Sequence, residues 1–221
     1  MTQIFHPSTN ALSRFTIFGG VFLVGALGFI ADRLSRSSWV TQVDVAVEQP
    51  VPFSHKHHAG NLGIDCRYCH FSVEEGRSAG IPPSKTCMTC HSVLFTAAEM
   101  LEPVRESFKT DRPIAWTRVH DLPDFVYFDH SIHLAKGIGC VSCHGRVDQM
   151  PLMWRENTLN MDWCLECHRD PSPHVRPLDK LFDMDWELPQ GEHGGESPSS
   201  LHDSLVLPEV HPQQSCSTCH R

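Results

Sequence analysis

The segment Cys140-Val141-Ser142-Cys143-His144 contains two cysteines three positions apart, followed at once by a histidine. The same spacing occurs five times and uses all ten cysteines of the 221-residue chain. Two thiols so placed can reach the two vinyl groups of one porphyrin, and the next histidine can ligate its iron, so Cys-x-x-Cys-His is the attachment signature of c-type haem. The other copies are Cys66-Arg67-Tyr68-Cys69-His70, Cys87-Met88-Thr89-Cys90-His91, Cys164-Leu165-Glu166-Cys167-His168 and Cys216-Ser217-Thr218-Cys219-His220.

Two other uses of paired cysteines explain this pattern less well. A tetrahedral zinc site built from cysteine pairs takes two pairs, which leaves one of the five stranded. A disulfide framework would give no role to the five histidines that follow the pairs. We therefore predict five covalent haems with iron, attached at the ten cysteines and ligated by His70, His91, His144, His168 and His220.

Composition supports a chain that folds around these groups. The chain has 16 histidines and a formal net charge of -8, and this acidic balance argues against nucleic acid as a partner. Residues 51–221 provide 171 residues for five haems, about 34 each, and haems with large apolar faces can replace an ordinary core. We predict a mainly α fold with extensive loops and little sheet: one N-terminal transmembrane helix followed by a multihaem cytochrome c domain.

Residues 15–31 form a run of 17 residues without a charge. As a helix this run would be roughly 26 Å long, near the lower limit for crossing a membrane, and the flanking Arg14 and Arg33 can extend it by snorkelling. The alternative is a cleaved signal peptide, with Val24-Gly25-Ala26 as the cleavage site. We favour the anchor, because apolar residues continue to Ala31.

An internal repeat divides the remaining chain. Phe53-x-His55-x-x-His58 precedes Cys66 by eight residues, and Phe128-x-His130-x-x-His133 precedes Cys140 by seven. Each is followed by two attachment motifs, and the repeat period is 75 residues. We predict five segments, which in chain order are an anchor, 1–35, a linker, 36–50, a first dihaem unit, 51–125, a second dihaem unit, 126–177, and an acidic loop with a terminal single-haem unit, 178–221.

The second axial ligand of each iron decides whether the haem is closed or open to substrates. Residues three apart share one face of a helix, so each His-x-x-His pair can serve two neighbouring irons. We therefore predict His55, His58, His130 and His133 as distal ligands, and His120 as the fifth. The competitors for the fifth position are His211, Met150, Met153 and Met161. Of the remaining histidines, we expect four on the protein surface, namely His57, His174, His193 and His202. We expect His6 on the cytoplasmic side of the membrane.

The Phe-x-His-x-x-His and Cys-x-x-Cys-His combination resembles class III multihaem cytochromes. Five motifs after one apolar segment, with the stretch Trp116–Gly145 before and across the third motif, resemble the pentahaem subunit of bacterial alternative complex III. The resemblance covers nearly the whole chain. It implies partners: an iron–sulfur subunit, a polytopic quinol-binding subunit, a monohaem cytochrome c, and a periplasmic cytochrome c or blue-copper acceptor.

The resemblance also implies a location and a role. Haem is attached outside the cytoplasm in bacteria, so we expect a single-pass protein of the plasma membrane with a periplasmic haem domain. We expect electron transfer by hopping between haems, in a complex that oxidises quinol, and no substrate site in this subunit. The alternative is a multihaem nitrite or hydroxylamine reductase. In pentahaem nitrite reductases the catalytic motif typically ends in lysine, whereas all five motifs here end in histidine.

Overall fold

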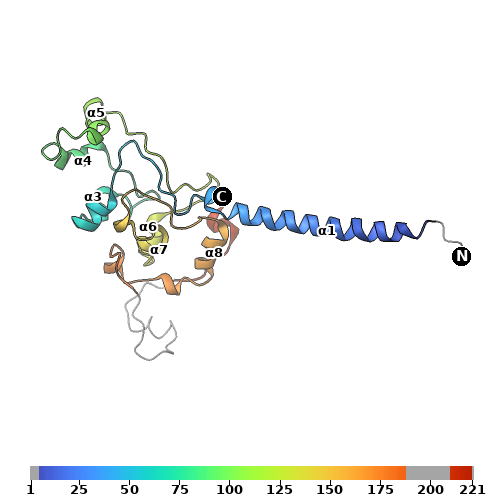
Figure 1. Ribbon diagram of the computed structural model, residues 1–221. Coiled ribbons are helices and arrows are strands. Elements are labelled where there is room, and N and C mark those ends of the chain that lie inside the picture. Colours follow the sequence, from blue (N-terminus) through green and yellow to red (C-terminus); the bar gives the residue numbers. More distant parts are fainter. Residues whose placement is uncertain (1–4, 188–209, 221) are drawn as a thin grey trace. The chain divides into compact units, whose positions relative to one another are not determined.

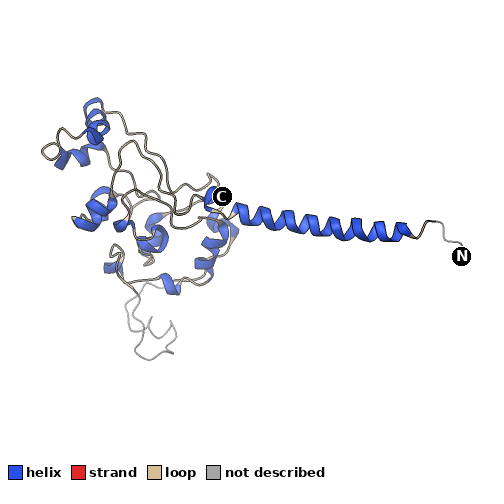
Figure 2. Cartoon of the chain, in the orientation of Figure 1, coloured by secondary structure: helices blue, strands red, loops and turns tan. Residues whose placement is uncertain are grey.

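The computed structural model describes residues 5–187 and 210–220, and the chain separates into two units, Met1–Val43 and Asp44–Arg221. The described part of the chain is helical and has no strand (Figure 2). Its only β-type pairing among those residues is two isolated bridges, Val126 with His220 and Ile138 with Val175. The predicted fold class, mainly α with long loops and little sheet, is confirmed.

The first unit is dominated by helix α1, Ser8–Ser35 (Figure 1). Its 28 residues give a length of roughly 42 Å, which exceeds the hydrocarbon thickness of a bilayer. None of them is buried, and the most apolar window has a mean hydropathy of 1.9. By length and composition α1 is suited to cross a membrane, a test that a signal sequence near an N-terminus also passes. The helix is longer at both ends than the predicted run 15–31, and a short helix α2, Ser38–Thr41, follows it.

The second unit consists of short helices joined by loops (Figure 1). Many are single turns, because glycine, proline and the attachment motifs interrupt every apolar stretch. The helices of this unit, in chain order, are η1 Lys56–Asn61, α3 Cys66–Cys69, α4 Ser84–His91, η2 Glu99–Leu101, α5 Glu102–Thr110, α6 His130–Ala135, α7 Cys140–His144, η3 Val147–Gln149, α8 Met161–Arg169, η4 Ser172–His174, η5 Leu178–Lys180 and α10 Cys216–Cys219.

The apolar core made by side chains is small. The buried cluster consists of Val73, Leu134 and Leu181, with Ala79 and Phe182 packed against it. Large apolar side chains elsewhere in the same unit stay exposed, among them Phe71, Phe95 and Phe125. Side-chain burial on this scale would not stabilise a chain of this length, so the fold needs additional apolar surface from bound groups.

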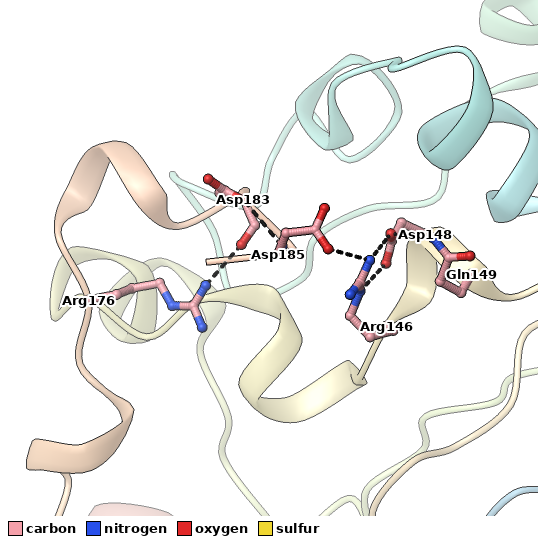
Figure 3. Close-up of polar contacts among 6 residues, drawn as sticks. All are labelled: Arg146, Asp148, Gln149, Arg176, Asp183 and Asp185. Atoms are coloured by element: carbon pink, nitrogen blue, oxygen red, sulfur yellow. Dashed lines mark hydrogen bonds and ion pairs between the residues drawn. The ribbon is translucent and has the colours of Figure 1, made fainter. Parts of the chain in front are cut away.

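Ion pairs fix the segment that follows the second repeat (Figure 3). Arg146 contacts the carboxylates of Asp148 and Asp185, each at 2.7 Å. Arg176 is only 6% exposed, and it donates hydrogen bonds to the backbone carbonyls of Lys180 and Asp183. The Arg176 bonds therefore hold residues 176–183 together, and the Arg146–Asp185 pair joins this segment to the residue that precedes η3.

The predicted segment boundaries agree only in part with the elements of the structure. The predicted linker 36–50 contains α2 and the division between the two units at residue 43. The predicted loop begins with the described turn η5, whereas residues 188–209, with His193 and His202, lie outside the described residues. The subdivision into two dihaem units and a terminal haem unit stays a prediction.

Candidate haem-binding sites

Each Cys-x-x-Cys pair occupies a single helical turn. The pairs lie within α3, α4, α7, α8 and α10. Because residues three apart share a helix face, both thiols of a pair can reach one porphyrin edge. None of the ten cysteines is joined in a disulfide. The helical turn therefore presents two free thiols and, directly after them, a histidine.

The electrostatic influence of one thiol on another reveals which attachment sites are neighbours. Burial, and after it the nearby Cys66, raises the pKa of the Cys140 thiol to about 11. Burial, and after it Cys167 and Cys164, raises the pKa of Cys143 to about 12. The third attachment site therefore lies between the first and the fourth.

The two remaining sites also have a neighbouring thiol. Burial and then the neighbouring Cys87 raise the pKa of Cys69. Burial and then Cys219 raise the pKa of Cys164. The neighbouring attachment sites are thus second and first, first and third, third and fourth, and fourth and fifth, a succession called here the row of sites; a 2.7 Å hydrogen bond between Tyr68 and Thr89 also joins the first two motifs.

Four of the predicted distal histidines face four of the motif histidines. A bond between an imidazole nitrogen and a metal is about 2 Å long, so rings on opposite sides of one iron have centroids roughly 6 Å apart. The ring pairs in the structure have centroid separations of 6.5 Å for His55 and His70, 6.2 Å for His58 and His91, 6.3 Å for His130 and His144, and 6.1 Å for His133 and His168. These four pairs fit bis-histidine ligation of haem iron.

The second ring nitrogen of most of these histidines is held by the backbone. Nδ1–H of His70 donates to the Gly80 carbonyl at 2.7 Å, and Nδ1–H of His133 donates to the Asp129 carbonyl at 2.6 Å. Such a bond fixes the tautomer and leaves Nε2 free to bind a metal. Further Nδ1–H bonds of this kind join His58 to Ser54, His91 to Leu94, His130 to Arg77 and His220 to Phe125. Sequence reasoning missed these carbonyls, because any residue type can supply one.

The two repeats have nearly the same geometry although their spacing differs by one residue. The ring of Phe53 lies edge-on to His55 at 4.9 Å and stacks on His58 at 4.5 Å. In the second repeat Phe128 does the same to His130 at 4.8 Å and to His133 at 4.5 Å. The phenylalanine of each repeat therefore orients both of its distal histidines.

A change of helix type accommodates the extra residue. In the first repeat the segment after His55 is a π-helix, η1, whereas in the second repeat α6 is an α-helix. A π turn holds one more residue than an α turn and arises where a residue is inserted. As a result the interplanar angle is 8° for His55 with His70 and 4° for His130 with His144.

The structure does not place His120 beside the fifth motif. Its ring centroid lies 4.3 Å from that of His144, and Nε2 of His120 is 3.2 Å from Nδ1 of His144. Burial, and after it Arg155 and His130, lowers the pKa of His120 to about 4. Burial, and after it His120, lowers the pKa of His144 to about 3. The role of His120 as a fifth axial ligand stays a prediction.

The other candidates for the fifth ligand have different surroundings. Met150 is fully buried in the protein core, and Met161 is 66% exposed at the start of α8. Met153 is half-buried, and its backbone carbonyl accepts a hydrogen bond from Val47. His211 is exposed. His6, His57 and His174 are exposed.

Comparisons with known proteins find similarity to multihaem cytochromes c. Residues 126–221 match the family model described as cytochrome c7 and related cytochrome c, and residues 35–112 match the class III cytochrome C family. A relative from Nitratidesulfovibrio vulgaris (strain Hildenborough), named "Menaquinone reductase, multiheme cytochrome c subunit", is 39% identical over 98 residues. The match covers 44% of this chain and 46% of that protein, so the chain spans about half of the relative's length.

Proposed function

We propose that the chain, of which residues 126–221 match cytochrome c7 and residues 35–112 match the class III cytochrome C family, holds five haems and is the electron-transfer subunit of a quinone-linked membrane complex. The observation that carries the proposal is the set of four histidine pairs with centroids 6.1–6.5 Å apart, distributed over neighbouring attachment sites. Haem iron supplies one-electron redox chemistry. The protein residues attach, ligate and orient the haems.

The row of sites suggests a path for electrons through this subunit. We infer that the second motif, on α4, and the fifth, on α10, are its two ends, because each has one neighbouring site among the thiols that influence one another. We propose that electrons enter at one end and leave at the other, and that the third site in the middle connects the two repeats. Two imidazole ligands close an iron to substrates, so this arrangement supports electron transfer without a substrate site at the first four sites.

The proposed setting is the bacterial plasma membrane, with α1 as the anchor and the haem domain in the periplasm. The proposed partners are an iron–sulfur subunit, a polytopic quinol-binding subunit, a monohaem cytochrome c, and a periplasmic cytochrome c or blue-copper acceptor. The resemblance to alternative complex III supports oxidation of quinol. The name of the relative, a menaquinone reductase, supports the reverse direction. Both directions need the same chain of haems, and we propose quinol oxidation.

The test is purification of the complex from native membranes through a tag on this chain. We expect co-purification of the subunits named above and reduction of a soluble cytochrome c by added quinol. Mass measurement of this chain gives the haem count independently. A complex that only reduces menaquinone at the expense of reduced cytochrome would contradict the proposed direction. A chain that purifies without partner subunits and reduces nitrite or hydroxylamine would contradict the electron-transfer role.

A further inference from the structure

We infer that His120 is a positioning residue for the third haem: it accepts a hydrogen bond from Nδ1–H of the proximal ligand His144 and thereby lowers the reduction potential of that haem. The inference rests on the proposed function, because it assumes that His144 ligates iron. The two ring nitrogens are 3.2 Å apart and both rings are partly buried. The centroid separation of 4.3 Å leaves no room for an iron between the two rings, so the contact is a direct hydrogen bond.

Comparison with the first repeat isolates what is special about this contact. His70 is the equivalent of His144, and its Nδ1–H donates to the backbone carbonyl of Gly80. The axial pairs of the two sites are similar, 6.5 Å and 6.3 Å apart and nearly parallel, although Nδ1–H of the distal His130 donates to the Arg77 carbonyl whereas Nδ1 of the distal His55 is buried without such a partner. The chain therefore contains two matched sites that differ in the acceptor for the proximal ligand: an amide oxygen in one and an imidazole nitrogen in the other.

Two side chains of one segment, residues 155–157, donate hydrogen bonds to the backbone next to both rings. The Arg155 guanidinium donates two hydrogen bonds to the carbonyl of Val119, the residue before His120, at 3.0 Å and 2.8 Å. Two residues later, Asn157 donates to the carbonyl of Cys143, the residue before His144, at 3.0 Å. Segment 155–157 thus fixes the backbone on both sides of the imidazole pair, as expected for a contact that sets the orientation of a ligand.

The chemistry of the contact gives the direction of the effect. A hydrogen bond from the free ring nitrogen of an axial histidine makes the ligand a stronger electron donor. A stronger donor stabilises ferric iron more than ferrous iron and so lowers the reduction potential. An imidazole nitrogen is a more basic acceptor than an amide oxygen, so the effect at His144 should exceed that at His70.

The experiment is potentiometry of the purified, haem-loaded full chain, followed by optical and electron paramagnetic resonance spectra. In His120→Ala we expect one haem of the five to titrate at a higher potential, with all five haems attached and each in the same spin state as in the wild type. In His120→Gln the side-chain amide oxygen can accept the same hydrogen bond, so we expect the potential to return most of the way. The control is His174→Ala, which removes an exposed histidine and should leave every potential unchanged.

Two results would overturn the inference. One is a His120→Ala variant in which no potential moves. The other is a variant in which one haem becomes high-spin and binds carbon monoxide, because His120 would then be an axial ligand, as the sequence predicted. Failure of the proposed function gives a different signature: the wild-type mass would show fewer than five haems, or the complex would lack partner subunits, whatever His120 does.

Discussion

Substitution of Gly60 by alanine tests the close approach of the first distal-ligand helix to the second repeat. Gly60 lies in η1, two residues after His58, and a Cβ at this position would collide with the backbone carbonyl oxygen of Asp148 in η3. The carbonyl carbon of Asp148 would be 3.4 Å away, which is close to ordinary contact. The obstacle is therefore a backbone atom, which cannot rotate away as a side chain can. Beside it, the backbone N–H of Lys56 donates a hydrogen bond to the carbonyl of Met150, which holds the two segments together.

The magnitude follows from two opposing effects. Overpacking costs typically 1–3 kcal/mol, about 2 kcal/mol in the middle of the range, and alanine regains up to about 1 kcal/mol over glycine in a helix. We expect Gly60→Ala to lower the free energy of unfolding by about 1–2 kcal/mol. Because η1 follows His55 and contains His58, we also expect the optical spectrum of the first two haems to change.

The assay is denaturant unfolding of the haem-loaded chain, followed by its Soret absorption. The matched control is Gly76→Ala, where a Cβ would meet the Ser72 carbonyl oxygen at 3.5 Å, an ordinary contact. Equal stability of the two variants, within about 0.5 kcal/mol, would refute the argument, because it would mean that η1 does not approach η3 as closely as the structure has it.

Three further predictions concern the ligands, the ion pairs and the anchor. In His58→Ala and in His133→Ala we expect one haem to become high-spin and to bind carbon monoxide; unchanged spectra would remove these residues from the ligand set. Arg146 lowers the pKa of Asp148 chiefly through a side-chain hydrogen bond (Figure 3), so the pair contributes stability above the unfolded-state pKa and loses it as the pH falls through the lower folded-state value. We therefore expect Asp148→Asn to cost about 1–2 kcal/mol of unfolding free energy at pH 7, with the difference shrinking below about pH 4; an equal cost at pH 3 would contradict the ion pair. The mature chain should retain residues 1–35 in mass measurement, whereas a mass without them would identify a cleaved signal peptide.

Much of the fold followed from local patterns in the sequence. The apolar run around residues 15–31 predicted α1, and the small number of residues per haem predicted a mainly α domain with extensive loops. The sequence also supplied the candidate ligands, because histidine and cysteine at fixed spacing carry a specific chemistry. The sequence could not provide the pairing of those ligands. The first histidine of each His-x-x-His pairs with the nearer motif and the second with the following motif, and this depends on how the loops return.

Local sequence patterns also could not predict the surroundings of His120, for a similar reason. The sequence indicated that the segment near Trp116 carries a ligand, because it lies between the two repeats. Its position beside His144 depends on Arg155, which is 36 residues from Val119 and has no motif of its own. Contacts between side chain and backbone across such distances leave no trace in residue spacing.

The π turn in η1 shows how the segment between the distal histidines and the attachment motif can differ in length by one residue. The segment between distal ligand and attachment site is one residue longer in the first repeat, yet the first axial pair is nearly parallel in both repeats, at 8° and 4°, and the second pair is steeply inclined in both, at 66° and 78°. A duplicated ligand module can therefore tolerate an insertion at this point without disturbing the metal. The length of this segment and the geometry of the axial histidines can therefore vary independently of each other.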